Sequence, residues 1–186
     1  MLLARLRNRL QTDKEGENQK SIKRTLDTIN AYKNQQAESR ANSRGELSKG
    51  KSSGSLPKIV LHIDDDPEDR ELVQEAIKLV DSSVIVHQAK SGKDGIEFLT
   101  KAKSSGVLPC LIILDINMPG INGFETYSEI KKSDELKNIP VVVFTTAAVF
   151  KEHEAKKNKD LPVFIKPETS RALNASIRAM LTYHCS

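Results

Sequence analysis

The sequence predicts an α/β domain in which a parallel sheet is covered by helices on both faces. Between residues 57 and 186, short apolar runs alternate with segments whose apolar residues recur at helical spacing. The apolar runs are continuous, which is typical of strands buried on both faces of a sheet. The composition changes near residue 57. We therefore expect an N-terminal extension and linker at 1–56 and one domain at 57–186.

The first half of the domain shows the alternation clearly. Residues 59–63 form an apolar run rich in β-branched side chains and predict the first strand. Asp66 and Pro67 follow it and are typical of a helix start, because Asp caps the free N–H groups and Pro fits the first turn. Residues 84–86 predict the second strand, and a second helix is expected from about Gly92.

The remaining elements continue the same alternation. We expect strands at 111–114, 141–144 and 163–165, and helices at 124–130, 151–160 and 173–181. The helix at 151–160 is highly charged and has a thin apolar face. Five strands then alternate with five helices, and right-handed crossovers leave few possible topologies. The flavodoxin-like (βα)5 doubly wound arrangement, with strand order 2-1-3-4-5, fits the size of the domain.

The extension is expected to be mostly disordered or partly helical. Residues 1–56 carry twelve Lys and Arg against six Asp and Glu, whereas 57–186 carry seventeen against nineteen. The basic balance therefore belongs to the extension, and the domain itself gives no reason to expect nucleic-acid binding. Ile22, Leu26 and Ile29 share one face of a helix that is too short to predict a coiled coil. Residues 40–55 have the composition of a flexible linker.

The cysteines and the hydropathy pattern favour a cytoplasmic protein. Cys110 begins an apolar run and Cys185 is next to last in the chain. We interpret them as one buried thiol and one tail thiol in a reducing compartment, rather than as a disulfide. No apolar run approaches the roughly 20 residues that cross a bilayer, so no membrane partner is expected.

Acidic side chains follow two strands that the predicted topology makes neighbours. Asp64 and Asp65 end the first strand, and Asp115 ends the third. In this topology the ligand crevice lies outside the carboxyl ends of these strands. Three converging carboxylates would repel one another without a cation. Their oxygen atoms suit Mg²⁺, which takes one or two protein carboxylates and keeps several waters.

Two more polar residues end the neighbouring strands. Thr145 follows the fourth strand and Lys166 follows the fifth. A carboxylate nucleophile, a divalent cation, a hydroxyl and an ammonium group are the parts required for phosphoryl transfer to an aspartate. Asp66 is interpreted as the helix cap rather than as a ligand. His62, inside the first strand, is interpreted as a packed histidine rather than a catalytic one.

Four segments in this order resemble the response regulator receiver family: IVLHIDDDPEDR, LIILDINMPGINGFE, IPVVVFTTA and VFIKP. The resemblance covers about residues 58–183. It implies that Asp115 is the phosphoacceptor and also binds metal. It further implies that Asp65 binds Mg²⁺ directly, that Asp64 binds it mainly through water, and that the backbone carbonyl of Asn117 is the third protein ligand.

The resemblance also assigns roles to the remaining site residues. Thr145 matches the hydroxyl that follows the phosphoryl group, and Lys166 matches the family's ammonium group. The bond between Lys166 and Pro167 is usually cis in this family.

The function implied is that of a single-domain response regulator in a two-component phosphorelay, because no output domain follows the last expected helix. The phosphoryl donor would be a histidine kinase or a histidine phosphotransfer protein, and the output a changed contact with a downstream protein. The protein is expected to be a monomer or a phosphorylation-dependent dimer. It would not be an enzyme beyond phosphorylating itself and weakly dephosphorylating itself.

Three alternatives remain open. A pseudo-receiver would keep the fold as a binding module without phosphorylation switching. A hydrolase with an aspartyl-phosphate intermediate requires a second acid two residues after the nucleophile, where this chain has Asn117. Flavin binding on the same topology requires a loop that cradles phosphate after the first strand, where three Asp residues would repel it.

Overall fold

The computed structural model describes residues 2–42, 57–146 and 161–185. The chain divides into two compact units, Met1–Pro57 and Lys58–Ser186, which are described separately. The expected linker at 40–55 falls almost wholly outside the described residues, as does the charged helix expected at 151–160. Among the described helices, none combines the length and the apolar character needed to cross a bilayer.

The described part of the first unit contains one long helix, α1 (Leu2–Asn42). It extends well beyond the short face that the sequence marked around Ile22 and Ile29. The physical reason is propensity. The segment is rich in Ala, Leu, Arg, Lys, Gln and Glu, which are strong helix formers, and it contains one glycine and no proline.

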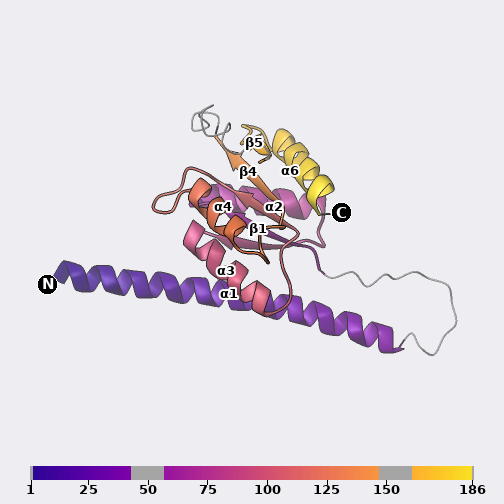
Figure 1. Ribbon diagram of the computed structural model, residues 1–186. Coiled ribbons are helices and arrows are strands. Elements are labelled where there is room, and N and C mark those ends of the chain that lie inside the picture. Colours follow the sequence, from indigo (N-terminus) through magenta and orange to yellow (C-terminus); the bar gives the residue numbers. More distant parts are fainter. Residues whose placement is uncertain (1, 43–56, 147–160, 186) are drawn as a thin grey trace. The chain divides into compact units, whose positions relative to one another are not determined.

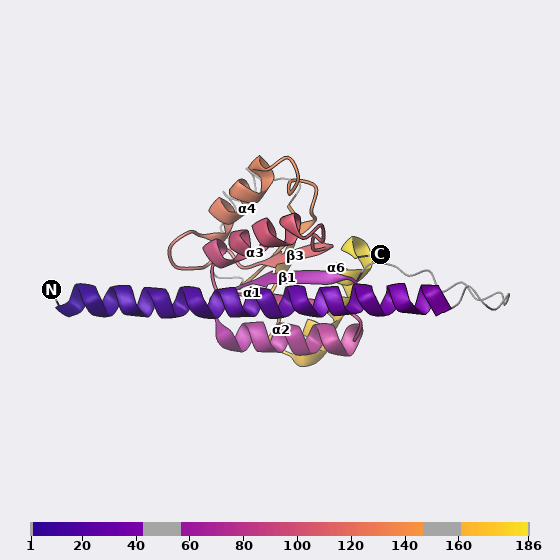
Figure 2. The ribbon, with the colours of Figure 1, turned by 90° about the horizontal axis from the view of Figure 1, so that it is seen from below.

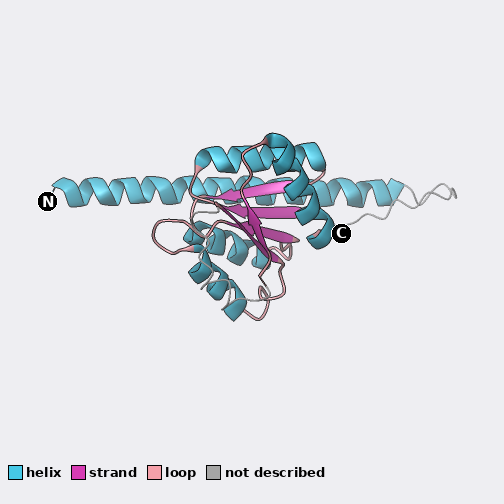
Figure 3. Ribbon diagram, turned by 90° about the horizontal axis from the view of Figure 1, so that it is seen from above, coloured by secondary structure: helices cyan, strands magenta, loops and turns pink. Residues whose placement is uncertain are grey.

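The second unit is built on a parallel sheet of five strands in the order β2-β1-β3-β4-β5, as predicted. Figure 3 shows the strands of this sheet in magenta. The strands are β1 (Ile59–Ile63), β2 (Ile85–Ala89), β3 (Leu111–Leu114), β4 (Val141–Thr145) and β5 (Val163–Ile165). β1, β3 and β4 are buried along their whole length, which explains their continuous apolar sequence.

Four described helices cover the two faces of this sheet. They are α2 (Pro67–Val80), α3 (Gly92–Ser104), α4 (Gly123–Lys132) and α6 (Ser170–His184). α2 and α6 pack together on one face, and α3 and α4 lie on the other (Figures 1 and 2). The α2–α6 layer encloses a core that includes Ile77, Phe144, Ile177 and Met180, all of which are at most 2% exposed.

The helix starts follow the chemistry of their first residues. The Asp66 side chain accepts hydrogen bonds from the amides of Glu68 and Asp69 at the start of α2, so it is the helix cap, as predicted. At the start of α4, Asn122 and Glu125 form a reciprocal capping box. These caps fix where each helix leaves the sheet.

Two expectations about covalent geometry are wrong. Cys110 and Cys185 form a disulfide rather than two separate thiols, because the residue before β3 and the residue after α6 come together although 75 positions separate them. Within the described residues no peptide bond is cis, so the bond between Lys166 and Pro167 is trans.

Candidate functional site

The carboxyl ends of β1 and β3 bring the three acidic residues together. Ile63 pairs with Leu114 in the sheet, so the residues that follow them emerge side by side. Asp64, Asp65 and Asp115 each offer a carboxylate oxygen, and these atoms lie within 4.8 Å of one another. Asp64 and Asp115 are buried, whereas Asp65 is exposed. This all-oxygen set of donors, open on one side, fits a hard divalent cation such as Mg²⁺.

Backbone contacts hold the two buried acids in place. The Asp64 amide donates to the Ala89 carbonyl at 3.0 Å, and the Asp115 amide donates to the Ile63 carbonyl at 2.9 Å. The guanidinium of Arg70 donates to the Asp64 carbonyl at 2.7 Å. Because β1 is paired on both sides, with β2 and with β3, these bonds leave the acidic pair little freedom to separate.

Each buried carboxylate also accepts a bond from the turn that follows it. Asp64 Oδ1 accepts from the Asp66 amide at 2.9 Å, and Asp115 Oδ1 accepts from the Asn117 amide at 3.2 Å. Asn117 is exposed, and its amide bond to Asp115 places it at the rim of the site. That the backbone carbonyl of Asn117 binds a metal ion stays a prediction.

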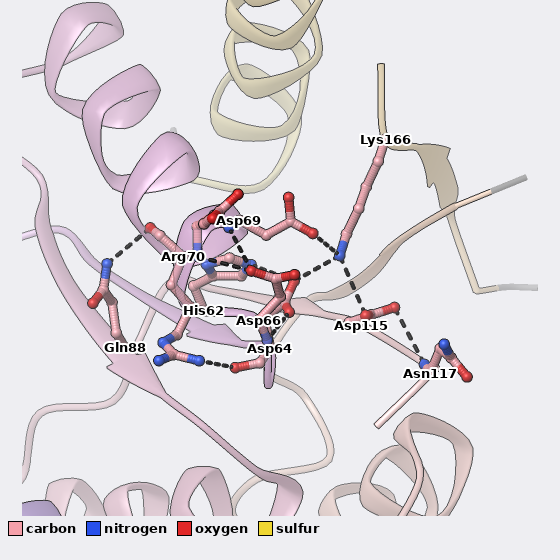
Figure 4. Close-up of polar contacts among 10 residues, drawn as sticks. His62, Asp64, Asp66, Asp69, Arg70, Gln88, Asp115, Asn117 and Lys166 are labelled. Carbon is pink, nitrogen blue, oxygen red and sulfur yellow. Dashed lines mark hydrogen bonds and ion pairs between the residues drawn. The ribbon is translucent and has the colours of Figure 1, made fainter. Parts of the chain in front are cut away.

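Lys166 lies among three carboxylates (Figure 4). Its Nζ is 2.8 Å from Asp64 Oδ2, 2.7 Å from Asp69 Oδ2 and 3.2 Å from Asp115 Oδ2. The backbone places this side chain, since the Lys166 amide donates to the Thr145 carbonyl at 2.8 Å. The ammonium group therefore bridges the ends of β1 and β3 from the far edge of the sheet.

Asp69 is the contact that sequence reasoning missed. It lies in the first turn of α2, where an acidic residue is adequately explained by the positive end of the helix. Asp69 and Lys166 are 97 positions apart in the sequence, so nothing local indicates that they form an ion pair. The one available signal was its spacing from Asp66, since the third residue of a helix that starts at the site can turn back toward it.

The charges in this cluster support one another. Burial alone would lower the pKa of Lys166, but its hydrogen bonds to Asp64 and Asp69 and the charge of Asp115 outweigh burial and raise that pKa well above its ordinary value. Burial alone would raise the pKa of Asp64, yet His62 and Lys166 together hold that pKa below its ordinary value. The site is thus built to keep its lysine protonated and Asp64 ionised.

Two buried polar side chains near the acids lack hydrogen-bond partners among the described residues. They are the hydroxyl of Thr145, at the end of β4, and the imidazole of His62, on β1. His62 Nε2 lies 3.6 Å from Asp64 Oδ2, which is too long for a hydrogen bond. A buried hydroxyl without a partner is costly, and an oxygen-rich ligand at this edge would satisfy it.

The comparison with known sequences gives a clear family. Residues 60–178 match the response regulator receiver domain. The response regulator Rcp1 of Synechocystis sp. is 38% identical over 96 residues, which cover 49% of this chain and 63% of that protein. The chain thus spans less than two thirds of the length of that relative.

Solved structures agree with this assignment. The Mn²⁺-bound form of Rcp1 has a TM-score of 0.58 and 29% identity, over 68% of this chain and 94% of that one. The phosphorylated cyanobacterial phytochrome response regulator RcpA has a TM-score of 0.61 and 27% identity, over 69% and 94%. With the flavodoxin-like fold, the acidic cluster and a family match over most of its length, this chain belongs to the response regulator receiver domain family.

Proposed function

We propose that this protein is a response regulator of a two-component phosphorelay and accepts a phosphoryl group on Asp115. The observation that carries the proposal is the convergence on Asp115 of two further carboxylates, which follow β1, and one ammonium group, which follows β5. Receiver domains partner with histidine kinases in two-component systems. The donor would be such a kinase or a histidine phosphotransfer protein, and the output a changed contact with a downstream protein.

The chain's own residues account for the transfer. One oxygen of the Asp115 carboxylate attacks the phosphorus, the bond from phosphorus to the donor breaks, and an acyl phosphate forms. Lys166 is close enough to Asp115 to donate a hydrogen bond to an oxygen of the incoming group. The Thr145 hydroxyl, which has no partner among the described groups, would donate to another.

A divalent cation would complete the charge balance. Asp64, Asp65, Asp115 and the carbonyl of Asn117 would hold Mg²⁺, which supplies positive charge for the oxygens of the phosphoryl group. A bound divalent metal in the structure of Rcp1 and phosphorylation in the structure of RcpA support the same reading of this site.

The protein would act as a phosphoacceptor rather than as an enzyme on other substrates, which is typical of the family. Weak loss of its own phosphoryl group is expected, because acyl phosphates hydrolyse. Its cytoplasmic location and its monomeric or phosphorylation-dependent dimeric state stay predictions.

Beryllofluoride, which imitates a phosphoryl group, provides the test. With Mg²⁺ present, titration should change the amide resonances around β4 and β5 in the wild-type protein. Asp115→Asn should fold but give no response, and its Mg²⁺ affinity should fall by about tenfold or more, because one buried carboxylate ligand is lost. A folded wild-type protein that responds to neither beryllofluoride nor acetyl phosphate would instead be a pseudo-receiver.

A further inference from the structure

Lys166 has more acidic partners than phosphoryl transfer requires. Asp64 and Asp115 belong to the cluster that could hold a cation, whereas Asp69 does not. Nevertheless Asp69 makes the shortest of the three contacts with the ammonium group, at 2.7 Å. An ammonium group has three N–H donors, and here each is directed at a different carboxylate.

Backbone hydrogen bonds hold both members of the Asp69–Lys166 ion pair in place. Asp69 is fixed by the first turn of α2, where its amide donates to the side chain of Asp66 at 3.3 Å. Lys166 is fixed by its amide bond to Thr145. The Lys166 side chain is 10% exposed and that of Asp69 is 35% exposed, so solvent screens this pair only in part. Figure 4 shows Lys166 reaching between Asp69 on one side and Asp115 on the other.

We infer that Asp69 is a positioning residue that anchors the Lys166 ammonium beside Asp115 through a carboxylate that lies outside the cation cluster. The inference deepens the proposed function and rests on it. Without Asp69, the ammonium group would have only Asp64 and Asp115 as charged partners. It would then compete with a divalent cation for both, and its flexible stem would be held at the site from one side only.

Asp69→Asn is the direct test, and Glu68→Gln is its matched control. Glu68 is the preceding residue in the same helical turn, is exposed, and is not among the bonding partners of Lys166. Both changes remove one negative charge near the site. Relative to Glu68→Gln, Asp69→Asn should weaken binding of Mg²⁺ and of beryllofluoride by roughly three- to tenfold. Equal affinities in the two variants would overturn the inference.

A double-mutant cycle with Lys166→Gln tests whether Asp69 acts through the lysine. In the Lys166→Gln background, Asp69→Asn should affect Mg²⁺ affinity no more than Glu68→Gln does, because the group that it positions is gone. If the full effect of Asp69→Asn persists in that background, Asp69 acts independently of Lys166 and the inference is wrong.

A measurement without metal separates this inference from the proposed function. The ammonium protons of Lys166, observed through the attached ¹⁵N, should exchange with water more slowly in the wild type and in Glu68→Gln than in Asp69→Asn. Unchanged exchange in Asp69→Asn would show that Asp69 does not hold the lysine. A wild-type protein that ignores beryllofluoride would overturn the proposed function, and the ammonium resonance would still decide the position of Lys166.

Discussion

At the scale of single residues, His87 on β2 is expected to make the fold sensitive to acid. Its side chain is buried, and its ring stacks on Phe98 with the ring centres 3.9 Å apart. Burial lowers the pKa of His87 from 6.5 to about 4. The folded protein therefore keeps this imidazole neutral at a pH where the unfolded chain has already protonated it.

The sign of the pH dependence follows from this difference. The unfolded chain binds more protons between about pH 6.5 and 4, so the free energy of unfolding should fall as the pH falls through that window, by at most about 3 kcal/mol from His87. Urea unfolding at pH 7 and at pH 4.5 measures the loss. His87→Leu should reduce the loss, whatever it does to stability at pH 7. An equal loss in both proteins would exclude His87 as the source.

Some residues of the site could be predicted from the sequence and others could not. Asp64 and Asp115 were predictable because each follows an apolar strand in a topology that makes the strand ends neighbours. Asp69 was not, because its local role at a helix start conceals a contact with Lys166, 97 positions away. Long-range pairing of a helix residue with a residue that follows a strand leaves no periodic trace in the sequence.

At the scale of elements, the start of α4 depends on a glycine. A Cβ atom added at Gly123 would lie 2.3 Å from the carbonyl oxygen of Asp115 and 2.5 Å from the Cα of Ile116. Both neighbours are backbone atoms directly after β3, so neither can move without displacing Asp115. The helix therefore approaches the strand more closely than any other residue type would allow.

Gly123→Ala should accordingly destabilise the protein by about 2 kcal/mol or more and weaken Mg²⁺ binding. Thermal unfolding and a Mg²⁺ titration measure the two effects. Gly16→Ala is the control, since a Cβ there meets nothing within 4 Å and alanine favours the helix. Equal stability of the two variants would mean that the β3–α4 connection adapts without cost.

The elements also differ in how well their sequences predicted them. β1, β3 and β5 were predicted with the bounds that the structure has. β2 was predicted to end at residue 86 but runs to Ala89, because His87 and Gln88 interrupt its apolar pattern while their backbone still pairs with β1. Pairing with a neighbouring strand, rather than hydropathy, determines where this edge strand ends.

At the scale of the whole molecule, the disulfide between Cys110 and Cys185 ties the end of the last helix to the start of the central strand β3. A cross-link over 75 positions restricts the unfolded chain strongly, and bonds of this span typically contribute about 2–4 kcal/mol. The same bond conflicts with the reducing cytoplasm expected from the sequence, where thiols are normally kept reduced.

The redox state of this pair should therefore set the stability of the whole domain. Adding a dithiol reductant to the oxidised wild-type protein should lower its thermal midpoint by several degrees. Cys185→Ser should show the lower midpoint from the outset and no further change with reductant. α6 packs against α2, so the loss should appear in the common unfolding transition rather than as fraying of the C-terminus. A wild-type midpoint that reductant leaves unchanged would mean that packing of α6 alone, through Ile177 and Met180, holds the chain end in place.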